Sequence, residues 1–225
     1  MKKCLLLNPG LVEYGRAWDL QKRLFHERSI GMVSDTLILL QHPPTYTLGR
    51  RSLPVQPVLD DNCGNRIPIY RVDRGGGATY HGPGQVVAYP ILGLRSYTLD
   101  YYNYLRLLED VIIHTLSDFN IISERVDGFT GVWVDGKKVG SIGIRIIRGI
   151  TMHGLSLNAN NDLTPFRKII PCNIHGVEMT SMTQISGNTL NMKEVEMSLV
   201  NNFSKVFDIE VSQIDVDNEY PNDVK

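Results

Sequence analysis

The chain offers little from which to build a metal site or a disulfide framework. Its three cysteines, Cys4, Cys63 and Cys172, are odd in number and far apart, so they form neither a set of pairs nor a C-x-x-C motif. Its six histidines show no H-x-H or H-x-x-x-H spacing. We therefore expect no bound metal and no other cofactor.

The chain also lacks a strong net charge and a long apolar run. Its formal net charge is −1, so no strong field attracts nucleic acid or an anionic membrane. The first apolar run ends at Pro9-Gly10, too early for the core of a signal peptide, and no run approaches the ~20 residues of a spanning helix. We expect a cytoplasmic protein without nucleic-acid or membrane partners.

The size and composition fit an ordinary globular protein. Hydrophobic residues make up 42% and charged residues 21% of 225 positions, enough for a substantial core. No internal repeat or low-complexity block divides the chain. The prediction is one domain over residues 1–225, with a small C-terminal lobe from about residue 160 as an open alternative.

Periodicity predicts helices mixed with antiparallel strands. Apolar residues at helical spacing predict helices over 14–29, 101–119 and 191–206, with Ser96 or Thr98 as the cap of the second and Asn191 as the cap of the third. Apolar or β-prone runs predict strands at 3–8, 36–40, 45–48, 69–72 and 85–92.

Turn residues predict where these elements end. Pro9-Gly10 is expected to end the first strand, and Asp135-Gly136 to form a tight hairpin. A further reversal at Arg148-Gly149 makes residues 130–157 a three-stranded meander. Residues 52–68, with Cys63, are expected to be an irregular surface excursion, and the tail from 208 another edge strand. This mixture favours an α+β fold over a doubly wound parallel sheet.

The stretch from Arg74 to Gln85 is the strongest candidate for a binding loop. Five of its twelve residues are glycine, which allows the backbone to turn with positive φ and to approach a ligand closely. No Gly-Lys-Ser/Thr follows, and the spacing does not match a dinucleotide site. Because Arg74, Tyr80, His81 and Gln85 accompany the glycines, the stretch is unlike a flexible connector.

Cys172 is the candidate nucleophile. It lies between Pro171 and Asn173, which suits a thiol presented at a sharp turn. A thiol becomes reactive when a base or cation favours its thiolate. His175 is the nearest candidate in sequence, whereas Lys138 follows the hairpin turn beside small residues. His153 alternates with apolar residues and is expected to be a core or lining histidine.

Four segments, in this order, resemble the lipoyl(octanoyl) transferase family, the acyl-carrier-protein-dependent octanoyltransferases of lipoate biosynthesis. They are the stretch from Arg74 to Gln85, Lys138-Val-Gly-Ser-Ile-Gly-Ile-Arg145, His153-Gly-Leu-Ser-Leu-Asn158 and Pro171-Cys172. Many relatives have Gly after the cysteine where this chain has Asn173. The resemblance implies the α+β fold of biotin and lipoate protein ligases and of class II aminoacyl-tRNA synthetase cores, with a mostly antiparallel sheet flanked by helices.

The resemblance also implies the roles of individual residues. Cys172 would be the nucleophile and Lys138 its activating partner. The implied substrate-binding residues are Arg74, Gly75, Gly76, Gly77, Ala78, Thr79, Tyr80, His81, Ser141, Ile142, Gly143, Gly154, Leu155 and Ser156. Backbone N–H groups near Gly77, Ser141 or Gly143 are candidates for an oxyanion hole.

The implied reaction joins two protein partners. The octanoyl group would pass from octanoyl-acyl carrier protein to Cys172 as a thioester. It would then pass to a lysine on a lipoyl domain of a 2-oxoacid dehydrogenase or on the glycine cleavage H protein. Conversion of the thioester to an amide makes this step downhill without ATP.

Two alternatives remain. An ATP-dependent lipoate or biotin ligase shares the fold and a related loop ending in Tyr-His, but it needs no nucleophilic cysteine. A non-catalytic module that binds acyl carrier or lipoyl domains would not need Cys172 and Lys138 together.

Overall fold

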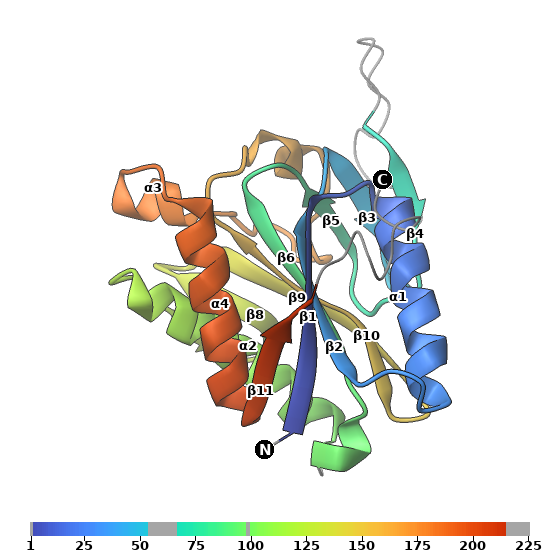
Figure 1. The fold of residues 1–225 in the computed structure, drawn as a ribbon. Coiled ribbons are helices and arrows are strands. Elements are labelled where there is room, and N and C mark those ends of the chain that lie inside the picture. Colours follow the sequence, from blue (N-terminus) through green and yellow to red (C-terminus); the bar gives the residue numbers. More distant parts are fainter. Residues whose placement is uncertain (1, 54–66, 98–99, 215–225) are drawn as a thin grey trace.

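The computed structural model describes residues 2–53, 67–97 and 100–214, which fold into two sheets with helices on both faces of the larger one (Figure 1). The strands are β1 Lys2–Leu11, β2 Asp35–Gln41, β3 Thr45–Leu48, β4 Ile69–Arg71, β5 Ala78–His81, β6 Gln85–Ile91, β7 Glu124–Val126, β8 Phe129–Val134, β9 Lys137–Ile147, β10 Ile150–Asn158 and β11 Ile209–Gln213. The helices are α1 Tyr14–Ser29, η1 Leu94–Tyr97, α2 Tyr101–Asp118, η2 Thr164–Lys168, α3 Met182–Ser186 and α4 Met192–Phe207.

The large sheet has the order β11-β1-β2-β6-β10-β9-β8-β7 and is antiparallel from β2 onwards. Within the described strands of this sheet, the parallel pairs are those that β1 makes with β2 on one side and β11 on the other. The predicted α+β class with a mostly antiparallel sheet is therefore confirmed. None of the helices in the described ranges is long and apolar enough to cross a membrane.

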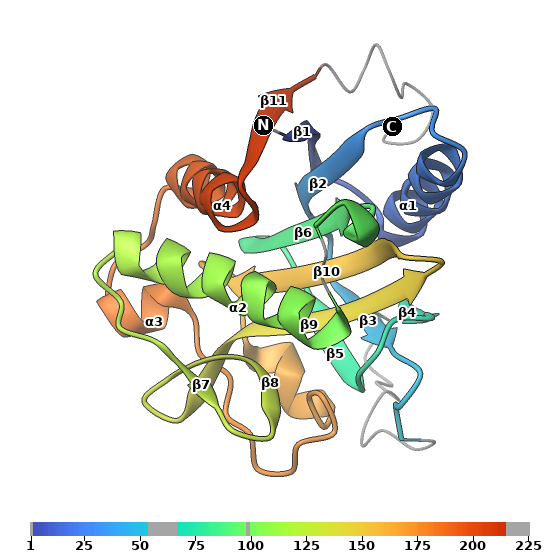
Figure 2. The same ribbon diagram turned by 90° about the horizontal axis from the view of Figure 1, so that it is seen from below.

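Alternation along β2 explains why the sheet is covered on both faces. Leu37 and Leu39 belong to the larger core cluster with α2 and α4, whereas Ile38 and Leu40 belong to a second cluster with α1. Successive side chains of a strand point to opposite faces, so an unbroken apolar run can be buried only between two layers. Figure 2 shows α1 on one side of the sheet and α2 and α4 on the other.

The glycine-rich stretch is not a single loop, which corrects one expectation. Ala78–His81 forms β5, which pairs with β3 in the small sheet β4-β3-β5. Tyr80 packs against Tyr46 and Phe166 in a third cluster beside this sheet. The Thr-Tyr-His part therefore forms a strand that leads out of the glycine turn.

The hairpin and helix predictions are confirmed, with two corrections at element ends. Asp135 and Gly136 both have positive φ between β8 and β9, as a tight hairpin requires. Asp100, not Ser96, caps α2, because its side chain accepts the Asn103 N–H at 2.8 Å. β1 continues to Leu11 through a register shift between Leu7 and Gly10, so Pro9-Gly10 bends the strand without ending it. Cys63 and Thr98 lie outside the described residues.

Candidate active site

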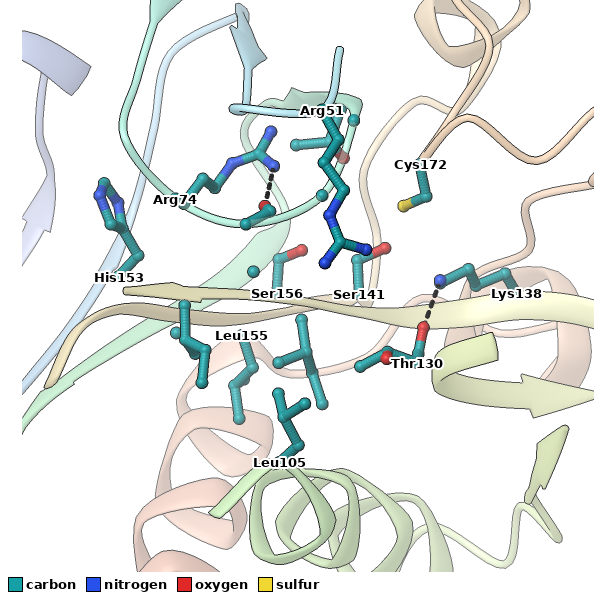
Figure 3. A pocket seen from close by; sticks show the side chains of 18 of the residues that line it. Arg51, Arg74, Leu105, Thr130, Lys138, Ser141, His153, Leu155, Ser156 and Cys172 are labelled. Carbon is teal, nitrogen blue, oxygen red and sulfur yellow. Dashed lines mark hydrogen bonds between the residues drawn. The ribbon is translucent and has the colours of Figure 1, made fainter. Parts of the chain in front are cut away.

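One cavity of about 370 Å³ collects most of the predicted site residues (Figure 3). It lies between the glycine turn after β4, the middle of β9 and β10, the first turns of α2 and the turn at Cys172. Its volume is within the range of pockets that bind small ligands. We call the part around Cys172 and Lys138 the thiol end, and the part around Arg74, His81 and His153 the histidine end.

The predicted substrate-binding residues divide between two faces of β5. Thr79 and His81 line the cavity, whereas Ala78 and Tyr80 alternate onto the opposite side. The other predicted binding residues that line it are Arg74, Gly75, Gly76, Gly77, Ser141, Ile142, Gly143, Gly154, Leu155 and Ser156. The structure thus brings together all the predicted residues except Ala78 and Tyr80, and their roles stay a prediction.

The glycine turn is held close to the chain around Cys172. A Cβ added at Gly77 would lie 2.3 Å from Asn173 Oδ1 and 2.8 Å from the Asn173 backbone nitrogen. The Gly77 carbonyl accepts a hydrogen bond from Gly49 N at 3.2 Å, and the Gly76 carbonyl one from Arg51 N at 3.1 Å. The sequence predicts that this backbone approaches a ligand closely. The structure shows it close to Asn173 of the same chain, and its approach to a ligand stays a prediction.

Cys172 is presented at a sharp turn, as the sequence predicts. Cys172 and Asn173 both have left-handed backbones, with φ of 56° and 60°. The turn is anchored because Cys172 N donates to the Ala78 carbonyl at 2.8 Å and Asn173 N donates to the Ile170 carbonyl at 3.2 Å. The Cys172 side chain is half-buried and lines the cavity, so a substrate carbonyl can reach its sulfur.

Lys138 lines the same cavity, and His175 does not. The Lys138 side chain is only 1% exposed, while the neighbouring Lys137 points to solvent and pairs with Glu178 at 3.0 Å. Nζ of Lys138 donates to the Thr130 carbonyl at 2.7 Å. Figure 3 shows Cys172 and Lys138 together at one end of the pocket. His175 is exposed on the surface.

Arg74 is fixed by β3 beside the glycine turn. Its Nη2 donates to the Thr47 carbonyl at 2.9 Å and to Thr47 Oγ1 at 2.8 Å, and its Nη1 donates to the Gly75 carbonyl at 3.0 Å. Burial lowers the pKa of the Arg74 guanidinium, and attraction to the ionised forms of Tyr14 and Cys172 opposes this. Arg74 thus places positive charge in the cavity within electrostatic reach of the thiol.

The histidine end contains buried histidines that are neutral at pH 7. His81 Nδ1 donates to Gln85 Oε1 at 2.7 Å, and His42 bridges the Val12 carbonyl and the Tyr89 hydroxyl at 2.7 and 2.8 Å. Burial lowers the pKa of His42 to about 4 and the pKa of His81 well below its usual value. Gln85 Nε2 continues the network to Asn158 Oδ1 at 2.9 Å.

His153 lies at the far end of the pocket from Cys172 (Figure 3). Its backbone is left-handed with φ of 56°, and its Nε2 lies 2.7 Å from Asp73 Oδ1. Burial lowers its pKa to about 3, and the positive charge of Arg74 and Arg145 adds to this effect. The predicted lining histidine is confirmed as a residue of the cavity wall.

Sequence reasoning missed several lining residues. Arg51, Tyr101, Leu105, Phe129 and Thr130 line the cavity from segments that carry no motif. Tyr101 and Leu105 belong to the apolar stripe from which the sequence predicts the α2 helix. The stripe continues past the core to the pocket wall, and periodicity alone cannot separate these two uses.

Known proteins similar to this chain show its family. The model of the lipoyl protein ligase A/B catalytic domain matches residues 13–204. The chain is 44% identical over 215 residues to an octanoyltransferase of Roseiflexus sp. (strain RS-1), with 93% of this chain and 90% of that protein covered. The chain belongs to the octanoyltransferase family. It is accordingly an enzyme of the acyltransferase class.

Solved structures show that this octanoyltransferase-family chain shares its fold with ligases. A bipartite lipoate protein ligase from Thermoplasma acidophilum aligns with a TM-score of 0.76 at 18% identity, covering 96% of this chain and 88% of that chain. A biotin protein ligase from Aquifex aeolicus aligns with a TM-score of 0.54 at 14% identity, covering 92% and 70%. At such identities the similarity concerns the fold alone. The predicted biotin and lipoate ligase-like architecture is confirmed.

Proposed function

We propose that this enzyme transfers the octanoyl group from octanoyl-acyl carrier protein to the ε-amine of a lysine on lipoyl domains, through a thioester on Cys172. The observation that carries the proposal is the position of Cys172 and Lys138 in one cavity, although 33 residues separate them in the chain. The geometry supplies a reachable sulfur, a buried amine beside it and an apolar wall that includes Leu105, Ile142 and Leu155.

In the first step, the Cys172 sulfur attacks the carbonyl carbon of the donor thioester. Lys138 Nζ takes the thiol proton and returns it to the departing carrier thiol when the old carbon–sulfur bond breaks. One thioester replaces another, so this exchange changes the free energy little. Arg74 adds positive charge near the reacting sulfur, and backbone N–H groups of the glycine turn or of β9 stabilise the tetrahedral oxyanion.

In the second step, the acceptor amine attacks the octanoyl-Cys172 carbonyl. The new carbon–nitrogen bond forms as the bond to sulfur breaks, and the amine proton passes through Lys138 to the released thiol. Because an amide is more stable than a thioester, the step needs no ATP. The lipoyl domains of 2-oxoacid dehydrogenases and the glycine cleavage H protein are the proposed acceptors, which makes this the first step of endogenous protein lipoylation.

The experiment is intact-protein mass spectrometry after mixing with octanoyl-acyl carrier protein. We expect one octanoyl group on the wild-type chain, none on Cys172→Ser, and formation slowed about 100-fold or more in Lys138→Ala, the usual scale of general acid–base catalysis. Adding a lipoyl domain without ATP should then move the label to that domain.

Two controls separate this proposal from the alternatives. Cys63→Ser should acylate like the wild type. Label on a lipoyl domain that appears only with ATP and survives Cys172→Ser would instead support a ligase. Binding of the carrier without any mass increase would support a non-catalytic module.

A further inference from the structure

We propose that Glu109 of α2 is a positioning residue that orients Lys138 through the peptide group between Thr130 and Gly131. This inference rests on the proposed function, because it assumes that Lys138 handles protons at Cys172. The side chain of Glu109 does not reach the substrate cavity, and no sequence motif singles it out.

A single peptide group connects the two side chains. Glu109 Oε1 accepts the Gly131 N–H at 2.9 Å, and the Thr130 carbonyl accepts Lys138 Nζ at 2.7 Å. The carbonyl of residue 130 and the N–H of residue 131 belong to one rigid, planar trans unit and point in opposite directions. When a carboxylate accepts the N–H, the carbonyl oxygen at the other end becomes a stronger acceptor.

Both of these ionisable side chains are buried. Glu109 and Lys138 are each 1% exposed. Within the described part of the chain, no carboxylate lies within ion-pair distance of Lys138 Nζ, and the Trp133 ring centroid is 5.2 Å away. A buried charge is costly unless hydrogen bonds or an opposite charge compensate it. The Thr130–Gly131 peptide, polarised by Glu109, provides such compensation. The Lys138 amine then needs no direct carboxylate partner, which would compete for its protons.

The backbone at Gly131 packs directly against the end of the Lys138 side chain. Its φ is 123°, and a Cβ added there would lie 2.7 Å from Lys138 Cε and 2.9 Å from Nζ. The end of the lysine side chain therefore passes directly over this Cα. Any movement of the Thr130–Gly131 peptide would move the Lys138 amine at the thiol end.

Two arginines hold the carboxylate of Glu109 in place. Arg106 Nη1 and Arg125 Nε both donate to Oε2, at 2.7 and 2.9 Å, which leaves Oε1 for the Gly131 N–H. Arg125 also pairs with Asp110. Asp110 is thus a matched control: it is adjacent in sequence and shares an arginine, but it does not contact the peptide.

The test is a double-mutant cycle on single-turnover acylation of Cys172 by octanoyl-acyl carrier protein. Glu109→Gln should slow acylation about tenfold with unchanged affinity for the carrier, while Asp110→Asn should change it less than twofold. In a Lys138→Ala background, Glu109→Gln should add less than a twofold effect. A purely structural role would slow both backgrounds equally, and that result would overturn the proposal.

Circular dichroism checks that each variant is folded. Should Glu109→Gln fail to fold, Glu109→Asp replaces it: drawing the carboxylate back by one methylene should slow acylation at least threefold, and only when Lys138 is present. Equal slowing in both backgrounds, or none, would overturn the proposal. Normal acylation in Glu109→Gln with slow Lys138→Ala rejects this inference alone, whereas normal acylation in Lys138→Ala rejects it together with the proposed function.

Discussion

At the thiol end of the pocket, Cys172 and Lys138 come from a left-handed turn and a hairpin strand, and the sulfur is half-buried and reachable. At the histidine end, His81 and Arg74 come from the small sheet and the turn beside it, and their polar atoms bond to Gln85 and Thr47. Both ends are rich in titratable groups. They differ in the partners of those groups. His81 and Arg74 each bond to several protein groups, and His153 bonds to Asp73 through Nε2 only, whereas Lys138 Nζ bonds to one carbonyl.

Under the proposed function, the thiol end is reactive and the histidine end supports it. Neutral buried histidines whose ring nitrogens have protein partners resist protonation and hold their neighbours in place. A thiol on a turn, beside a buried amine bonded to a single carbonyl, has capacity left for a substrate. Perturbed pKa values alone would point to the histidine end, since burial strongly lowers the pKa values of His42, His81 and His153.

The largest expected effect comes from adding one methyl group at Gly77, which displaces the Cys172 turn at the thiol end. Gly77→Ala places a Cβ 2.3 Å from Asn173 Oδ1, so the Cys172 turn must shift. Because a displacement of ~1 Å can cost ~100-fold in rate, we expect thioester formation to slow by about that factor. Single-turnover acylation followed by mass spectrometry measures it.

Gly75→Ala is the control in the same turn. Its added Cβ would meet the Ile144 carbonyl at 3.4 Å, an ordinary contact, so the Cys172 turn should stay in place. Although Gly75 lines the cavity, we expect about tenfold less slowing than in Gly77→Ala. Equal rates for the two alanine variants would show that the packing of Gly77 against Asn173 does not set the position of the sulfur.

The next largest effect is the loss of folding stability in acid that we expect from His42, which packs against His81 of the histidine end. Burial lowers the pKa of His42 to about 4, so below pH 6.5 the unfolded chain binds a proton that the folded chain does not. Stability therefore falls as pH drops from 6.5 towards 4, and this one group contributes a loss of about 2 kcal/mol between pH 7.5 and 5. Urea unfolding at both pH values measures the loss.

His42→Gln isolates this contribution. The variant is less stable at pH 7.5, because it disturbs the bonds to Val12 and Tyr89, but its further loss on going to pH 5 should be smaller than that of the wild type by about 2 kcal/mol. Identical acid losses in the two proteins would mean that His42 is protonated in the folded state.

The smallest effect compares two adjacent lysines. Lys137 and its partner Glu178 are 52% and 69% exposed, and such surface pairs contribute at most about 1 kcal/mol. Lys137→Ala should therefore unfold within about 4 °C of wild type and acylate within about twofold of it. Lys138→Ala, one residue away, should lose most of its activity. A large rate loss in Lys137→Ala would contradict the assignment of the buried lysine as the reactive one.

Much of the fold was readable from the sequence where short-range rules decide it. The Asp135-Gly136 hairpin, the helix from Tyr14 and the Asn191 cap follow from turn chemistry and spacing, and all are confirmed. The choice of Ser96 over Asp100 as the cap of α2 is a local error, but two other errors arise where a distant partner competes. β5 exists because β3 pairs with it, and β1 continues past Pro9 because β2 supports its bent end.

The sequence by itself determined which residue types this protein has for chemistry: a cysteine between proline and asparagine, a lysine after a tight turn, and an arginine followed by glycines. It also favoured a sharp turn at Cys172, because a preceding proline and a following asparagine suit one, while the Ala78 carbonyl of β5 anchors that turn. Only the tertiary structure decided that Lys138 and not His175 shares a cavity with Cys172, and that Glu109 lies behind the Thr130–Gly131 peptide. These contacts join different elements, and their geometry depends on how α2 and β9 pack across the sheet, which no spacing along one segment encodes.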